Sequence, residues 1–324
     1  MSDDAGLLSA YLLDGRGGAR PLSWDAVLGW KPADGVLWVH LDRSEPRAEA
    51  WLQRDSGLDQ LVVAALLAEE TRPRCSVLPK GLLIILRGVN LNPGADPEDM
   101  VSLRMWLGGS RVITVRRRRL MAVQDVHDEL EAGSGPATQG GVVVAVAERL
   151  VERIAPVVLD LDEKLDHLEV QTLDGATEGL RPQLAQLRRE AIALRRHIAP
   201  QREALASLCS ATTDLLADSE RMRLREVSDR VTRYVEDIDA LRERAAVTND
   251  ELGTQLAETM NRRMYILSLV AAVFLPLGLL TGLLGINVGG IPGTNYEWSF
   301  TIVTLLLIAI GGCAAWWLRR RQLF

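Results

Sequence analysis

A polar residue able to bind a cation follows a long apolar segment near the end of the chain. Met264 to Ile286 contains no charged side chain, and Asn287 comes directly after it. An unpartnered amide is costly in hydrocarbon, so we expect Asn287 to face water, protein or a pore. A ring of such amide oxygens could hold a cation with its hydration shell intact, and Gly285 would let backbone carbonyls approach the ion. The alternative is a helix cap at the membrane surface.

Few other residues in the sequence indicate chemistry. There is no phosphate-binding loop, nucleophile elbow or HExxH motif, so the sequence predicts neither an enzyme nor an ATP-driven pump. Imidazole is a common zinc ligand, but His127 and His167 could join a metal site only if folding brought further ligands, and we expect both on solvated helix faces. No CxxC pair occurs, which argues against a disulfide framework or a thiolate zinc site.

The apolar segment that precedes Asn287 is one of two predicted transmembrane helices. Met264 to Ile286 and Ser299 to Leu318 are both free of charged side chains. At about 1.5 Å per residue, each can cross a hydrocarbon core of roughly 30 Å. Basic residues flank the pair on its outer sides, and the positive-inside rule therefore places both termini in the cytoplasm. These residues are Arg262, Arg263, Arg319, Arg320 and Arg321.

A long helix is predicted to lead into the first span. Apolar residues recur at steps of three and four along 217–263, as in a helix with one packed seam. No proline occurs between Pro200 and Pro276, which allows this stalk and the first span to form one continuous helix. A seam of this length needs partners. The seam residues are Leu224, Val227, Val231, Tyr234, Ile238, Leu241, Ala245, Thr248, Leu252 and Leu256.

The part of the chain before the stalk has a different character. Val142 to Thr172 and Arg181 to Leu216 are predicted as helices of an antiparallel hairpin, and the Gly-rich stretch 133–141 as a linker. Before it, β-like runs at 35–41, 82–89, 101–108 and 111–116 and a helical stretch at 58–70 predict an α/β or α+β domain.

Composition limits the location and partners of this domain. The first ten residues lack the basic segment and apolar core of a signal peptide, so we expect the domain in the cytoplasm. A net charge of −6 argues against a general nucleic-acid binder. The predicted plan is an α/β domain (1–140), a helical hairpin (141–216), a stalk helix (217–263), a first span (264–286), an outer loop (287–298), a second span (299–318) and a cytoplasmic tail (319–324).

The stretch NRRMYILSLVAAVFLPLGLLTGLLGINVGGIPG, residues 261–293, resembles the signature segment of the CorA metal-ion transporter superfamily. That family carries a Gly-X-Asn tripeptide at the end of its first span, matched here by Gly285, Ile286 and Asn287. Magnesium-transporting members usually have Gly-Met-Asn and then an acidic loop motif. Ile286 and the loop VGGIPG depart from that pattern and resemble the zinc-transporting ZntB branch.

The resemblance implies a fold and a set of pore residues. The fold is a funnel-shaped homopentamer with an α+β cytoplasmic domain, a long stalk helix and two C-terminal transmembrane helices. The implied pore-lining positions are Asp250, Asn261, Met264, Leu267, Leu275, Gly278 and Gly282. Leu275 stands where magnesium members commonly have Met, and Gly278 where they often have Thr.

Physical arguments give these positions roles and alternatives. Their spacing keeps most of them on one helical stripe. Rings of Met264, Leu267 and Leu275 could close a pore by dewetting, or could simply pack between helices. Asp250 and, in the outer loop, Glu297 could attract cations, although surface carboxylates without a task are common.

The sequence therefore favours a transporter of Zn²⁺, with Cd²⁺ as a related ion, in the bacterial cytoplasmic (inner) membrane and surrounded by lipid. Uptake would be driven by the membrane potential or by coupled protons. One alternative is a Mg²⁺, Co²⁺ or Ni²⁺ transporter of the same fold. Another is a membrane-anchored coiled-coil scaffold or sensor. We expect no permanently bound cofactor.

Overall fold

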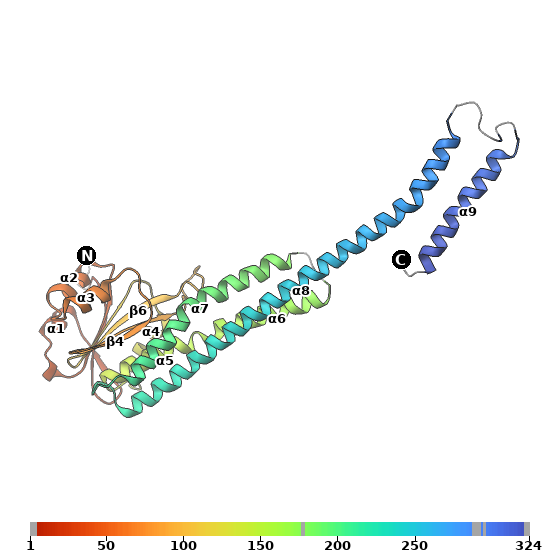
Figure 1. Ribbon diagram of the computed structural model, residues 1–324. Coiled ribbons are helices and arrows are strands. Elements are labelled where there is room, and N and C mark those ends of the chain that lie inside the picture. Colours follow the sequence, from red (N-terminus) through yellow and green to blue (C-terminus); the bar gives the residue numbers. More distant parts are fainter. Residues whose placement is uncertain (1–4, 176–178, 287–292, 294–295, 321–324) are drawn as a thin grey trace. The chain divides into compact units, whose positions relative to one another are not determined.

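The computed structural model describes residues 5–175, 179–286, 293 and 296–320 (Figure 1). The chain forms two compact units, Met1–Asn249 and Asp250–Phe324, which are described separately below. The first unit contains the sheet and its helices. The second contains the apolar segments that the sequence predicts to cross a membrane.

A mixed sheet of seven strands forms the core of the first unit. Its order is β2-β1-β3-β7-β6-β5-β4. β3 and β7 are parallel, with Leu37 opposite Arg111 and Asp42 opposite Arg116, and the other neighbouring pairs are antiparallel. The strands are Leu7–Leu13 (β1), Ala19–Pro21 (β2), Leu37–Asp42 (β3), Arg74–Leu78 (β4), Gly81–Gly88 (β5), Val101–Gly108 (β6) and Arg111–Arg116 (β7).

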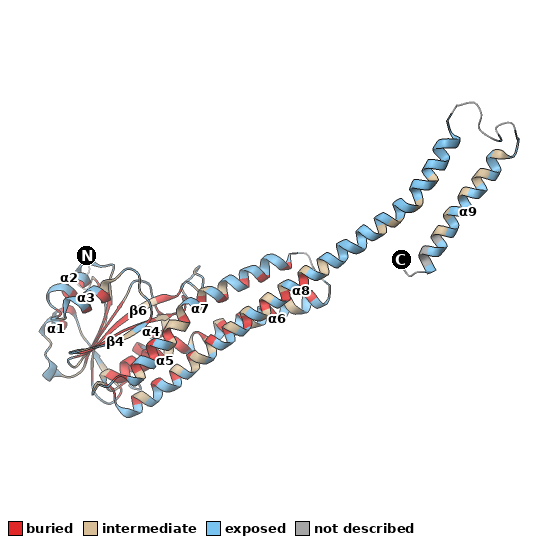
Figure 2. Ribbon diagram, viewed as in Figure 1, coloured by how far each residue is buried: buried red, intermediate tan, exposed pale blue. Residues whose placement is uncertain are grey.

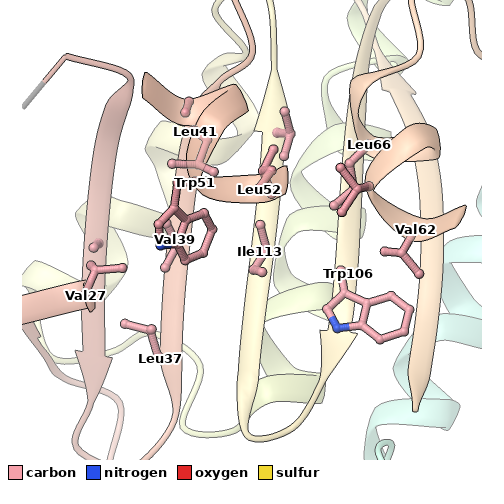
Figure 3. Close-up of a cluster of buried hydrophobic side chains, with 14 of the residues drawn as sticks. Val27, Leu37, Val39, Leu41, Trp51, Leu52, Val62, Leu66, Trp106 and Ile113 are labelled. Atoms are coloured by element: carbon pink, nitrogen blue, oxygen red, sulfur yellow. The ribbon is translucent and has the colours of Figure 1, made fainter. Parts of the chain in front are cut away.

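One face of the sheet is covered by short helices and carries a large apolar core. Trp51 and Leu66 pack with Val39 and Ile113 in one cluster of buried side chains (Figure 3). The strands in the middle of the sheet are buried on both sides, which explains their nearly continuous apolar sequences (Figure 2). The covering elements are Trp24–Gly29 (α1), the 3-10 turn Pro32–Asp34 (η1), Pro46–Arg54 (α2) and Gln60–Leu67 (α3).

The other face is covered by helices that follow the last strand. Met121–Glu131 (α4) and Gln139–Glu152 (α5) pack against each other, and α5 also packs on the sheet. The Thr138 hydroxyl caps α5 by accepting the Gly141 N–H at 2.9 Å. Arg153, directly after α5, donates two hydrogen bonds to the Asp125 carboxylate of α4 at 2.6 and 2.8 Å. This bidentate pair ties the two helices together.

The predicted helix Val142–Thr172 is two helices, so that expectation was wrong. α5 ends before Arg153, and Ala155–Leu173 (α6) begins with Pro156 in its first turn. Proline has no N–H and clashes with the carbonyl four residues earlier, which stops α5 from continuing into α6. Leu180–Ser210 (α7) packs against α6 and against β4 and β5, and it ends before the predicted Leu216.

The predicted stalk and first span form one helix, Asp218–Leu284 (α8). In the first unit its buried side chains follow steps of three and four and include Val227, Val231, Ile238 and Leu241. Val235 rather than the predicted Tyr234 is buried in this seam. The apolar periodicity therefore predicted the helix and its packed face, with a local error of one residue.

Ion pairs fasten this part of α8 to the preceding helices. Arg195 of α7 pairs with Asp239 at 2.5 Å, and Arg223 of α8 pairs with Glu148 of α5 at 2.6 Å. Arg244 of α8 pairs with three carboxylates of α6. These carboxylates belong to Asp162, Asp166 and Glu169.

The second unit contains the end of α8 and Ser299–Arg320 (α9). Among the described residues, α8 is long and apolar enough to cross a membrane, with a mean hydropathy of 2.3 over its most apolar stretch. None of that stretch is buried. α9 contains a shorter apolar segment, Ser299–Ala314.

Candidate functional site

Seven of the positions that the sequence analysis predicts to line a pore lie within the described residues. All seven are on α8, and all are exposed. At 3.6 residues per turn, they fall within a stripe about 120° wide along one side of the helix. A stripe of this kind can line an axial path when several copies of the helix surround it. The positions are Asp250, Asn261, Met264, Leu267, Leu275, Gly278 and Gly282.

Near the middle of this stripe, α8 combines a missing backbone hydrogen bond with a glycine on its surface. Pro276 lies inside the helix and has no N–H to donate to the preceding turn. The Thr281 hydroxyl donates to the carbonyls of Leu277 at 3.0 Å and Gly278 at 3.1 Å. A Cβ added at Gly278 would contact nothing within 4 Å. The helix surface is therefore open here, and another helix or an ion can approach the backbone closely.

The Gly-X-Asn tripeptide begins where α8 ends. The Gly285 N–H donates to the carbonyls of Thr281 at 3.0 Å and Gly282 at 3.2 Å, closing the last turn. A Cβ at Gly285 would lie 3.0 Å from the Thr281 oxygen, so a larger residue would crowd this turn. Ile286 is exposed. Asn287 lies outside the described residues, and its predicted role stays a prediction.

Between α8 and α9, the structure describes Gly293 and the residues from Tyr296 onward. The Ser299 hydroxyl donates to the Gly293 carbonyl at 2.6 Å, and the Tyr296 N–H donates to the same oxygen at 3.1 Å. Glu297 and Trp298 are exposed next to the start of α9. An exposed carboxylate beside aromatic side chains suits a water-facing membrane boundary.

The apolar side chains of the predicted first span have no cover within the chain. Leu267 is 70% exposed, Phe274 68% and Leu275 77%. Apolar surface on this scale is unfavourable in water and is normally covered by lipid or by another protein surface. Leu280 and Leu283 are also exposed and lie on other sides of the helix, so one partner helix could not cover all of these side chains.

The two histidines considered as metal ligands have different surroundings. His127 is buried, contrary to expectation, and lies 3.1 Å from the Ser9 hydroxyl through Nε2. Burial, with a contribution from Arg116, lowers the pKa of His127 to about 4. His167 is exposed as expected. In the described part of the chain, no three His, Cys, Asp or Glu side chains are grouped to hold a metal ion.

Arg244 positions α8 on α6, a role that the sequence analysis did not predict. Its guanidinium lies 2.7 Å from Asp162 and 2.6 Å from Glu169, and it also pairs with Asp166. These hydrogen bonds raise the pKa of Arg244. The acidic residues recur at steps of four and three on α6, and that spacing was the available signal for a shared basic partner.

Residues 33–320 match the family described as CorA-like Mg2+ transporter protein. The chain belongs to this CorA-like family. Membership confirms the predicted family and places the chain among transporters rather than enzymes.

Individual relatives cover nearly the whole CorA-like chain. The divalent cation transporter CmaX of Pseudomonas aeruginosa is 42% identical over an alignment of 327 positions, which covers 98% of this chain and 97% of the relative. The zinc transport protein ZntB of Pectobacterium atrosepticum is 38% identical over 319 residues, covering 98% and 96% of the two chains. The similarity is therefore not confined to the signature segment.

Solved structures confirm the predicted fold of the single CorA-like chain. The full-length CmaX protein has a TM-score of 0.84 at 38% identity, covering 98% of each chain. The CorA magnesium transporter of Methanocaldococcus jannaschii has a TM-score of 0.82 at 17% identity, covering 96% of this chain and 97% of the other. The second likeness concerns the fold alone.

Proposed function

We propose that this chain carries divalent cations, most favourably Zn²⁺, along an axial path formed by the α8 helices of five copies. The carrying observation is the uncovered end of α8. Its apolar surface is unburied, and one stripe of it leads to Gly285 and Ile286, directly before Asn287. Five copies would cover part of this surface with each other, and lipid would cover the rest.

The groups on the stripe suit an ion that keeps its water. Zn²⁺ prefers nitrogen and sulfur ligands in direct coordination, and the stripe offers amide oxygens, backbone carbonyls and apolar side chains instead. A ring of Asn287 amides would attract a hydrated cation by ion–dipole interaction without trapping it. Selection in this path would depend on the size and charge of the hydrated ion.

The apolar positions and Pro276 supply a gate in this proposal. Rings of Met264, Leu267 and Leu275 would exclude water when the helices are close together and admit it when they separate. Pro276 weakens the helix one residue after Leu275, so a bend there would change the width of the ring. Exposed Asp250 and Glu297 would raise the local cation concentration at the two ends of the path.

The membrane arrangement and the energy source complete the proposal. Both spans cross the bacterial cytoplasmic membrane, with both termini inside and the predicted domain plan unchanged. A potential of roughly 100 mV contributes about 2.3 kcal/mol per charge, and therefore about twice that for a divalent cation entering the cell. Uptake needs no ATP on this basis, and a coupled proton would add to the driving force.

Two alternatives make different predictions. The family description names Mg²⁺, which favours a Mg²⁺, Co²⁺ or Ni²⁺ transporter as the second candidate. The similarity to ZntB, together with the replacement of the usual Gly-Met-Asn by Gly285, Ile286 and Asn287, favours Zn²⁺. A membrane-anchored scaffold or sensor would use the spans as an anchor and would carry no ion.

Flux in sealed liposomes tests the proposal. We expect purified protein to carry Zn²⁺, and Asn287→Ala to lose most of this flux while keeping the oligomer. Asn295→Ala is the matched control, because it removes an amide from the same outer loop without touching the tripeptide. Faster flux with an inward proton gradient would support coupling. Mg²⁺ flux alone would favour the second candidate, and no flux of either ion would contradict transport.

A further inference from the structure

Two adjoining cavities lie at one end of the sheet, in the part of the first unit that the transport proposal does not use. The larger, of about 550 Å³, lies between α1, α2 and the start of β3. The smaller, of about 390 Å³, lies between α3, the β4–β5 turn and the end of β6, and we call it the Trp106 pocket. Gly109 and Arg111 line both cavities, so Arg111 stands at their junction. Volumes of this size suit a small organic molecule.

The Trp106 pocket has an apolar wall held in place by close backbone contacts. Figure 3 shows Trp106 of β6 next to Val62 of α3. A Cβ at Gly81 would lie 2.7 Å from the Trp106 ring, and one at Gly108 would lie 2.4 Å from the Lys80 carbonyl. Only glycine permits these approaches, which bring the β4–β5 turn against β6 and set Lys80 at the rim.

The charge of Arg111 is not balanced in this pocket. Its Nη2 donates to the Ser56 carbonyl at 2.5 Å, and among the described residues no carboxylate forms an ion pair with it. Burial lowers the pKa of Arg111. The Asp59 carboxylate, also at the pocket, accepts the Leu61 N–H at 2.8 Å as the cap of α3. Asp59 and Asp55 line the two cavities but neither forms an ion pair with Arg111, and a half-buried guanidinium without such a pair favours a bound anion.

We propose that the Trp106 pocket binds a small amphipathic organic anion. The apolar body of the ligand lies against Trp106, Val62 and Leu58, and its anionic group meets Arg111 with help from Lys80. Arg111 can donate through its other N–H groups while it keeps the Ser56 contact. The site is independent of the transported ion, and its ligand would stabilise the first unit whether or not ions move.

Calorimetric titration of the full chain in detergent, with micelles alone as the blank, tests this site. The probe is 1-naphthoate, and its uncharged partner is 1-naphthalenemethanol, which has the same ring system. We expect 1-naphthoate to bind saturably at one site per chain. The alcohol should bind at least about tenfold more weakly, because it cannot form the charge-assisted hydrogen bond.

Variants separate the charge from the cavity. Arg111→Gln should weaken 1-naphthoate binding about tenfold, and Lys80→Gln, at an exposed position, by a few fold. Leu61→Trp places a larger side chain at the pocket while retaining Arg111, and it should abolish binding. Leu61 is 63% exposed, so this change should leave the fold intact. Arg20→Gln, on the outer strand β2 and at neither cavity, should bind like the original chain.

Several outcomes would overturn the proposal. Equal affinities for 1-naphthoate and 1-naphthalenemethanol would show that the negative charge of the ligand does not contribute to binding. Binding unaffected by Leu61→Trp would place the probe elsewhere, and no saturable binding at low-millimolar concentration would exclude the class of ligand. A change of oligomer mass with Leu61→Trp would instead assign the surface to a contact between copies. None of these readings depends on ion flux.

Discussion

Both parts of α8 carry apolar side chains, but the surroundings of these side chains differ. Before Asn249, side chains such as Val231 and Ile238 are fully buried against helices of the same chain. After Asp250, side chains such as Leu267 and Leu275 are mostly exposed. One uninterrupted helix therefore includes a seam satisfied within the chain and a surface that needs partners from outside it.

This difference shows what each part of the helix is for. The buried seam and the ion pairs around Arg244 fix α8 to the first unit, which is the role of a structural element. The exposed part has no charged side chain from Met264 to Ile286 and ends at the Gly-X-Asn tripeptide. Its surface is suited to lipid and to other copies, and hence to a shared path. Substitutions should accordingly separate stability from flux.

The largest expected stability effect comes from emptying the buried seam. Ile238→Ala removes a fully buried side chain and should lower the free energy of unfolding of the first unit by about 2–5 kcal/mol. Leu267→Ala is the matched change on the exposed part and should shift unfolding little. Thermal unfolding followed by circular dichroism measures both. Equal losses would show that the two parts of α8 are not distinct.

Acidification should destabilise the first unit through its buried histidines. Burial holds the pKa of His127 near 4 and that of His40 well below its usual value, whereas the unfolded value is near 6.5. The unfolded chain therefore binds protons first, and the free energy of unfolding falls as pH drops from 6.5 towards 4. For His127 the loss is on the order of 3 kcal/mol.

A non-titrating replacement isolates this effect. His127→Gln keeps a group able to bond with the Ser9 hydroxyl and should make the pH dependence of unfolding between pH 6.5 and 4 shallower, while His40 and His197, whose pKa values burial also lowers, retain the rest. His167→Gln is the control, because His167 is exposed. An unchanged slope in His127→Gln would show that other groups carry the acid sensitivity.

A smaller effect is expected at the ion pairs of Arg244. Arg244→Ala leaves three carboxylates of α6 without their cation and should cost on the order of 1 kcal/mol, because these side chains are partly exposed. Arg244→Lys should restore part of the loss. The difference between the original chain and Arg244→Ala should shrink in high salt. A salt-independent difference would point to lost packing rather than charge.

The least effect on the single chain is expected at Gly278. A Cβ there would meet open space, so Gly278→Val should barely change unfolding of the first unit. In an assembly, the added side chain would separate neighbouring helices and lower the oligomer mass or the flux. Native mass measurement in mild detergent checks this. Unchanged mass and flux would show that no helix or ion approaches Gly278.

The sequence predicted the long helix, whose apolar side chains recur at regular steps. The three- and four-residue steps from Leu224 onward identified the long helix, because its buried side must face its partners at every turn. The short outer strands β2 and β4 were not predicted, since three or five residues carry little periodic signal. The break at Pro156 was missed because the sequences on both sides are strongly helical.

For the candidate site, the sequence predicted the family and the helix that carries the site, but not the number of copies. The apolar run, the glycines and the tripeptide indicated an ion path and a family, and the family is confirmed. The number of copies cannot be read from one chain, because a stripe shows which side faces a partner but not how many partners there are. The burial of His127 was missed because its contacts with Ser9 and Trp38 join residues far apart in sequence.

Cysteine accessibility on the two sides of α8 tests the central claim most directly. Cys75, Cys209 and Cys313 are replaced by serine, and a cysteine is placed at Leu275 on the predicted stripe or at Val273, on the opposite side of the helix. We predict that a charged thiol reagent labels Leu275→Cys and blocks Zn²⁺ flux, whereas Val273→Cys faces lipid or protein and stays unlabelled. Equal labelling, or labelling of Val273→Cys alone, would contradict a path along this stripe.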